Sequence, residues 1–279
     1  MGAGICQLAA AAGLQVLAVE TDPRTAEAGR ERISALVRRG VAKGKIPAAD
    51  GDRVLGRVQV VTALRDVAPA DFVIEAVFED PQVKADLFAS LDRTCRPEAI
   101  LATNTSSISI TRIASATRRP GQVIGMHFFN PVPVMKLVEI IRGLATSDDT
   151  FAATRDLAVR LGKTPVEVND AAGFVSNRVL MPMINEAAFA LMEGVATAEA
   201  IDQVMVLGMN HPMGPLALAD LIGLDVCLHV MEVLHKELGD SKYRPCPLLR
   251  RMVQAGRLGR KTHRGFFVYG PDGAARPAL

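Results

Sequence analysis

The sequence predicts an α/β fold: a doubly wound parallel sheet followed by an all-helical C-terminal domain. Short apolar runs alternate with helical patterns over the first 170 residues, which is typical of a parallel sheet covered by helices. After Asp170 this alternation stops, and the remaining sequence reads as a series of helices. We therefore expect one domain at residues 1–171 and a second at residues 172–279.

The expected strands are β-branched apolar runs, and they fall at residues 14–20, 58–62, 71–77, 99–104, 122–129 and 136–141. Between them we expect a basic helix up to about Gly44, a helix at 81–95 and a helix from Ile108. In the second domain the helix at 174–192 is apolar around much of its circumference. Such a helix needs a buried partner surface, and we expect a homodimer through the helical domain.

Composition excludes several classes of protein. The 279 residues are 49% hydrophobic, and 32 basic against 30 acidic residues give a net charge of +2, which offers no general field for nucleic acid. No run approaches the ~20 apolar residues of a membrane span, and the uncharged first 19 residues lack the basic leader of a signal peptide. Four cysteines without C-x-x-C spacing indicate reduced thiols and no zinc site. We expect a cytoplasmic protein without a metal, a nucleic-acid partner or a membrane partner.

The stretch GMHFFNPVPVMKLVEII at 125–141 carries one histidine and one glutamate in apolar surroundings. Two strands flank NPVPV, and the turn between them should centre near Pro133. His127 and Glu139 lie equally far from Pro133, so an antiparallel hairpin makes them neighbours. A histidine held by a carboxylate suits a group that takes a proton near neutral pH. The alternative is a structural His–Glu pair inside a core.

The chain start resembles the later part of a dinucleotide-binding fingerprint of the Rossmann type. Gly2 and Gly4 precede a helix of small residues, and the next strand closes on Glu20. In that fingerprint the helix N-terminus meets the pyrophosphate and the acid bonds the ribose hydroxyls, which favours NAD over NADP. The alternative for Glu20 is an ordinary solvated glutamate at a strand end.

The first two glycines of the fingerprint and the strand before them are not in this sequence. That first strand is central in a doubly wound sheet, so we expect two inner strands to face each other across a gap. Either the chain start is drawn too far downstream or the chain binds NAD poorly, and the retained site residues favour the first explanation.

Taken together, several stretches resemble the L-3-hydroxyacyl-CoA dehydrogenase family, which includes the 3-hydroxybutyryl-CoA dehydrogenases. They are MGAGICQLAAAAG, EAVFEDPQVK, ATNTSSISI, HFFNPVPVMKLVEII, DAAGFVSNRVLMPMINEA and PMGPLALADLIGLD. The match runs from Gly2 to about Tyr269, nearly the whole chain. The family oxidises the 3-hydroxyl of an L-3-hydroxyacyl-CoA with NAD, so the resemblance implies an acyl-CoA substrate and a role in fatty acid metabolism.

The resemblance also implies roles for single residues. The catalytic set would be His127 as general base, Glu139 as its partner, and Ser106 and Asn177 near the reacting oxygen and the imidazole. The cofactor-binding set would be Gly2, Gly4, Glu20, Glu79, Lys84, Ser106 and Asn130.

Some alternatives stay open from the sequence. Ser106 could cap the helix expected from Ile108, and Lys84 could be an ordinary solvated residue. A dehydrogenase of the same fold acting on a sugar acid is a second possible function. A third is a catalytically silent homologue, which the truncated fingerprint favours and the intact catalytic set opposes.

Overall fold

The computed structural model describes residues 1–270 and 275–277. The chain divides into two compact units, Met1–Ala171 and Ala172–Leu279.

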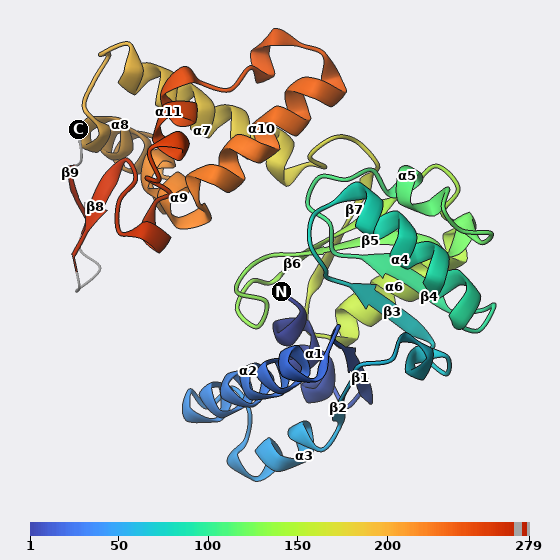
Figure 1. Ribbon diagram of the computed structural model, residues 1–279. Helices are drawn as coiled ribbons and strands as arrows, with labels where there is room; N and C mark the ends of the chain where they lie inside the picture. Colours follow the sequence, from blue (N-terminus) through green and yellow to red (C-terminus); the bar gives the residue numbers. More distant parts are fainter. Residues whose placement is uncertain (271–274, 278–279) are drawn as a thin grey trace. The chain divides into compact units, whose positions relative to one another are not determined.

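The first unit contains a five-stranded sheet in the order β3-β4-β5-β6-β7. Its strands are β3 (Phe72–Glu75), β4 (Ile100–Thr103), β5 (Val123–Phe128), β6 (Leu137–Arg142) and β7 (Thr164–Asn169). Strands β3, β4 and β5 are parallel, β6 returns antiparallel to β5, and β7 is parallel to β6. This is a Rossmann-type sheet with an antiparallel step at the hairpin (Figure 1).

The remaining two strands of the unit form a separate sheet. Strand β1 (Val16–Val19) pairs in parallel with β2 (Val58–Val61), and within the described residues no strand joins this pair to the five-stranded sheet. In a complete doubly wound sheet β1 and β3 would flank the first strand. Strands β1 and β3 lie in different sheets, as the sequence predicts.

Helices cover the sheets of this unit (Figure 1), and their bounds are α1 (Gly2–Ala11), α2 (Pro23–Ala42), α3 (Gly51–Leu55), α4 (Pro81–Thr94), α5 (Ile110–Ala114) and α6 (Asp148–Arg160). Both α2 and α4 begin with Asp followed by Pro. The Asp22 and Asp80 side chains accept the N–H groups of the first turn, and proline at the next position has no N–H to satisfy. The sequence thus fixes where these helices start.

Helix α3, helix α6 and strand β7 of this unit were not predicted. Strand β7 carries Pro165 and is mostly exposed, so it has no apolar run to mark it. It lies at the edge of the sheet, where a proline and polar side chains are tolerated. Helix α6 connects β6 to β7 and was missed with it.

In the described part of the second unit, α-helices pack around one apolar core, which includes Met181, Leu216, Met231 and Phe266. The helices are α7 (Ser176–Met192), α8 (Ala198–Gln203), α9 (Pro215–Ile222), α10 (Leu224–Leu238) and α11 (Pro247–Gln254). The all-helical prediction needs one correction, because β8 (Phe267–Tyr269) and β9 (Ala275–Pro277) form a small antiparallel sheet. Helix α7 begins two residues later than expected, since Phe174 takes a positive φ of 50° and cannot belong to the helix.

Candidate active site

The His127–Glu139 pair is at the carboxyl end of β5. His127 lies opposite Glu139 in the β5–β6 register, and its Nδ1 is 2.9 Å from Glu139 Oε2. The two residues are 8% and 2% exposed. The hairpin symmetry about Pro133 is confirmed.

This geometry fixes the chemistry of the imidazole. A carboxylate only accepts hydrogen bonds, so Nδ1 carries the hydrogen in the neutral ring and the lone pair is at Nε2. If Nε2 takes a proton, Glu139 faces the resulting imidazolium. The ring also lies 4.8 Å from the ring of Phe129, centroid to centroid, at an angle of 45°. The pair can therefore accept a proton and stabilise the charge that results.

The turn between the two strands is held from outside the hairpin. Lys163, which precedes β7, donates from Nζ to the carbonyl oxygen of Met135 at 2.7 Å and to that of Val132. Burial, together with the charge of Lys45, lowers the pKa of this lysine. Sequence reasoning missed Lys163, because nothing local distinguishes it from a solvated lysine.

Helix α1 packs closely on the same turn. A Cβ atom at Gly4 would lie 3.0 Å from Cβ of Val132, which is tighter than an ordinary van der Waals contact, so a larger residue there would require Val132 to shift. A Cβ at Gly2 would lie 3.9 Å from Cβ of Ala76, the residue after β3. The N-terminus of α1, whose first N–H groups lack intrahelical acceptors, is thus at the carboxyl end of β3.

Glu20 follows β1 and is close to both α1 and α2. Burial, and then the negative charge of Glu20, raise the pKa of Cys6 in α1 to about 11, and a Cβ at Gly29 would lie 3.2 Å from Glu20 Oε1. A helix N-terminus at the carboxyl end of one strand and a carboxylate after another are the groups that bind the pyrophosphate and ribose of a dinucleotide. The residues present fit NAD.

Ser106 lies in the turn after β4, next to Glu79. Its N–H and hydroxyl contact Glu79 Oε1 at 2.8 and 3.3 Å. The side chain that caps α5 is Ser109, which accepts the N–H of Arg112. The alternative that Ser106 is the helix cap is therefore wrong, because the helix starts later than the sequence indicates.

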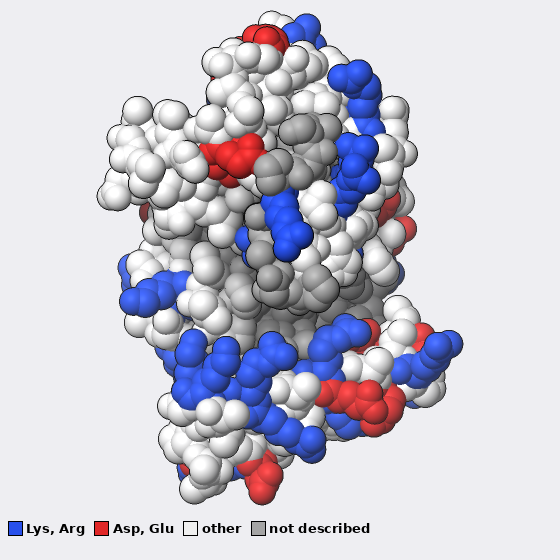
Figure 2. Space-filling model, turned by 90° about the vertical axis from the view of Figure 1, so that its left-hand side faces the viewer, with Lys and Arg blue, Asp and Glu red and all other residues white. Residues whose placement is uncertain are grey.

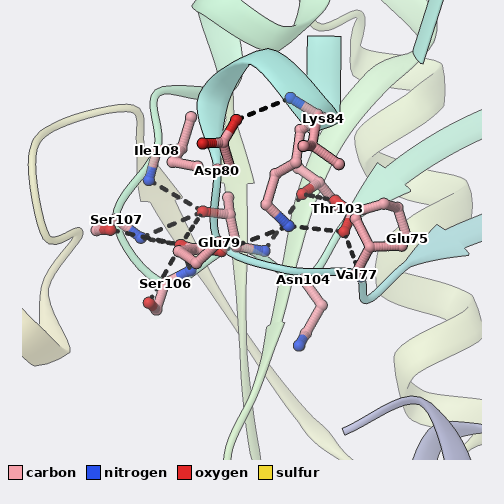
Figure 3. A network of polar contacts seen from close by, with 12 residues as sticks. Glu75, Val77, Glu79, Asp80, Lys84, Thr103, Asn104, Ser106, Ser107 and Ile108 are labelled. Atoms are coloured by element: carbon pink, nitrogen blue, oxygen red, sulfur yellow. Dashed lines mark hydrogen bonds and ion pairs between the residues drawn. The ribbon is translucent and has the colours of Figure 1, made fainter. Parts of the chain in front are cut away.

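Lys84 is buried, so the alternative of a solvated lysine is also wrong. Its side chain is 1% exposed, and Nζ lies 2.6 Å from Glu75 Oε1 and 3.4 Å from Glu79 Oε2 (Figure 3). Sequence reasoning missed Glu75. The available signal was a carboxylate inside the apolar run DFVIEAV, where an unpaired charge is costly.

The two predicted asparagines lie in different units. Asn130 is exposed and begins the turn after β5, two residues beyond Phe128. Asn177 is half-buried in the first turn of α7, in the second unit. The structure thus brings His127 together with Glu139, and Ser106 together with Glu79 and Lys84.

Residues 1–270 and 275–277 contain no group of three His, Cys, Asp or Glu side chains arranged to hold a metal ion. In the same part of the chain no helix combines the length and the hydropathy that crossing a membrane requires.

Comparison with known proteins places the chain in a family. The model described as "3-hydroxyacyl-CoA dehydrogenase, NAD binding domain" matches residues 1–171, and that described as "3-hydroxyacyl-CoA dehydrogenase, C-terminal domain" matches residues 173–269. A probable 3-hydroxybutyryl-CoA dehydrogenase of Bacillus subtilis is 58% identical over 269 residues, covering 96% of this chain and 94% of the relative. The 3-hydroxybutyryl-CoA dehydrogenase of Bradyrhizobium diazoefficiens is 50% identical and covers 96% and 92%.

Solved structures agree with the sequence matches. The crystal structure of (S)-3-hydroxybutyryl-CoA dehydrogenase from Ralstonia eutropha matches with a TM-score of 0.93 and 50% identity, over 97% of this chain and 95% of that chain. This likeness extends over both units. The chain belongs to the 3-hydroxyacyl-CoA dehydrogenase family.

Proposed function

We propose that this protein oxidises the 3-hydroxyl of an L-3-hydroxyacyl-CoA, such as 3-hydroxybutyryl-CoA, to the 3-ketoacyl-CoA with NAD. The observation that carries the proposal is the buried His127–Glu139 pair, 2.9 Å from Nδ1 to Oε2, at the carboxyl end of the sheet. The names of the relatives support the substrate class.

In this proposal His127 Nε2 accepts the proton of the 3-hydroxyl. Glu139 keeps the ring in the tautomer that has its lone pair at Nε2, and it offsets the charge of the imidazolium. From the family resemblance, Ser106 and Asn177 hydrogen-bond near the reacting oxygen and the imidazole. The proton thus has an acceptor while the carbon loses its hydride.

NAD, when bound, accepts that hydride. The residues proposed to hold it are Gly2 and Gly4 at the start of α1, Glu20 after β1, and Glu79, Ser106 and Asn130 at the carboxyl ends of β3, β4 and β5. Lys84 is buried and would act on this site through Glu79.

An acyl-CoA substrate also carries phosphate groups, which need cationic partners. Basic side chains gather on the lower part of the face shown in Figure 2, where α2 lies. Exposed residues at the end of α2 and just beyond it are Arg38, Arg39, Lys43 and Lys45. Their charge favours an anionic ligand on this side of the first unit.

The test is formation of NADH by the purified protein at alkaline pH, with L-3-hydroxybutyryl-CoA and, separately, with a sugar acid. Turnover of the acyl-CoA alone is expected. Turnover of the sugar acid alone would identify the other dehydrogenase of this fold. A folded protein that turns over neither would be a silent homologue, against the intact His–Glu pair.

We also propose a homodimer formed through the helical unit and a cytoplasmic location. Part of the apolar surface of α7 is used within its own unit, where Met181 and Ile184 are buried. Other apolar side chains of this unit remain exposed: Val179 in α7 is 69% exposed, and Leu207, between α8 and α9, is 82% exposed. Sedimentation should give twice the 29.8 kDa of one chain, and a monomer at micromolar concentration would contradict the dimer.

A further inference from the structure

The carboxylate of Glu75 is enclosed at the end of β3, and both of its oxygens are used (Figure 3). Oε1 accepts Lys84 Nζ at 2.6 Å and the N–H of Val77 at 2.7 Å. Oε2 accepts the Thr103 hydroxyl at 2.6 Å. The side chain is 0% exposed, so these three donors replace water completely.

Lys84 shares its ammonium between two carboxylates. The same Nζ that contacts Glu75 lies 3.4 Å from Glu79 Oε2. In this buried cluster one positive charge faces two negative charges. The position of the ammonium therefore depends on Glu75 as much as on Glu79.

Glu79 in turn organises the turn after β4. Its Oε1 accepts the N–H groups of Ser106 and Ser107 at 2.8 and 3.2 Å, and it also accepts the Thr105 hydroxyl. Burial raises the pKa of Glu79, but the Thr105 hydroxyl, the charge of Lys84 and the Ser106 N–H outweigh it, so the pKa is below its usual value. The carboxylate thus sits as an anion on the N–H groups of the turn.

A second connection runs through the backbone. The carbonyl of Glu75 accepts the N–H of Asn104 at 2.8 Å, and the Asn104 side chain accepts the N–H of Phe128, the residue after His127, at 2.8 Å. The end of β3 is therefore tied to the strand ends that carry both Ser106 and His127.

We propose that Glu75 is a positioning residue: its charge holds Lys84, Lys84 holds Glu79, and Glu79 holds the 105–107 turn that presents Ser106. The catalytic part of this inference rests on the proposed function, because Ser106 is placed there at the reacting oxygen. The mechanical part does not, since it concerns the contacts among these side chains only.

The direct test is Glu75→Gln, which keeps the shape of the side chain and removes its charge. The amide oxygen can accept from Lys84 and Val77, and the amide NH2 can donate to the Thr103 hydroxyl, which is able to accept. Lys84 then has one carboxylate instead of two. We expect kcat to fall by about 10–10² as the turn moves from its productive position, with KM for the acyl-CoA unchanged.

Hydrogen exchange provides a readout that does not depend on activity. Amides in the peptide 104–109 should exchange faster in Glu75→Gln, because Ser106 and Ser107 lose a fixed acceptor. The matched control is Glu167→Gln, which removes an exposed carboxylate paired with Arg142 in the same unit. The control should leave both kcat and this exchange rate unchanged.

A folded Glu75→Gln protein with normal kcat, or with normal exchange in 104–109, overturns the proposal. If that variant does not fold, Thr103→Val removes the donor to Glu75 Oε2 and keeps all three charges. It also removes the acceptor of the Thr105 N–H, so exchange is then read at the Ser106 and Ser107 amides only. It should show the same two changes to a smaller extent, and their absence would equally overturn the proposal. A wild-type protein inactive on acyl-CoA would remove the proposed function, while faster exchange in Glu75→Gln would still support the mechanical role of Glu75.

Discussion

Buried carboxylates are balanced differently in the two units. In the first unit Glu79 has Lys84 beside it, and Asp92 has Arg118 and Arg119, whose Nε atoms lie 2.9 and 2.7 Å from its oxygens. Burial raises the pKa of Asp92 and of Glu79, but the hydrogen bonds and cations outweigh it, and both pKa values are below their usual range.

In the second unit the buried carboxylates have neutral partners. Asp202 accepts the N–H groups of Leu216 and Ala217, both at 2.9 Å. Asp220 accepts two N–H groups and the Tyr269 hydroxyl, and among the described residues neither aspartate forms an ion pair. Burial therefore prevails and raises the pKa of both.

Carboxylates with cationic partners and carboxylates with neutral partners therefore have different roles. A carboxylate that faces a cation keeps its charge, as the lowered pKa values of Glu79 and Asp92 indicate. A carboxylate bound only by neutral donors ties chain segments together, as Asp220 ties α9 to β8. The following predictions test this contrast.

The largest effect is expected for His127→Gln. Removing a positioned general base should lower kcat by about 10²–10⁴, and folding and NAD binding should remain intact. Steady-state NADH formation measures the loss, with thermal unfolding as the check on folding. Turnover near that of the wild type would show that the His127–Glu139 pair is structural.

In the second unit Asp220→Asn should affect stability. The asparagine NH2 would face buried donors, so the free energy of unfolding should fall by about 1–3 kcal/mol, with kcat unchanged in the folded protein. Denaturant unfolding measures the change. The control is Asp225→Asn, an exposed partner of Lys261, which should cost about 0–1 kcal/mol.

Lowering the pH should change the stability of the two units differently. The raised pKa values of Asp202 and Asp220 mean that their charge costs stability at neutral pH, so the second unit should gain protection as the pH falls toward about 4, the usual carboxyl value. The lowered pKa values of Glu79 and Asp92 mean that their charge stabilises the first unit when the pH is above the pKa of these carboxyl groups in the unfolded chain, about 4. This stabilisation is lost only as the pH falls below that value.

Hydrogen-exchange protection factors for each unit, at neutral and mildly acid pH, measure this difference in pH response. Asp220→Asn should remove much of the second unit's gain. Equal changes of protection in the two units would show that neutral and cationic partners have the same effect on how a carboxylate's stability contribution depends on pH.

The smallest effect is expected at the partly exposed Glu20. Its carboxylate repels a 2′-phosphate by about 1 kcal/mol at 4 Å in water, so Glu20→Ala should relax the preference for NAD over NADP several-fold. The ratio of kcat/KM with the two cofactors measures it. A wild-type preference for NADP would remove the ribose role of Glu20.

The sequence predicted the hairpin because its evidence is local. Two apolar strands around two prolines fix a register, and that register alone pairs His127 with Glu139. The small-residue helix and Glu20 were equally visible, since the fingerprint is a contiguous pattern.

The buried cluster could not be predicted in the same way. Lys84 lies in the first turns of α4, where a lysine is normally solvated, and Glu75 ends a strand nine residues earlier. Only the packing of α4 on the sheet shows that they meet. Strand β7 was missed for a related reason: an edge strand with a proline has no apolar pattern to reveal it.

The most direct test of the account is the turnover of His127→Gln, Glu139→Gln and the double variant, measured together with L-3-hydroxybutyryl-CoA. If Glu139 acts through His127, the double variant should be no slower than His127→Gln alone, because the carboxylate has no imidazolium left to stabilise. Losses that multiply in the double variant would contradict the pair acting as one catalytic unit.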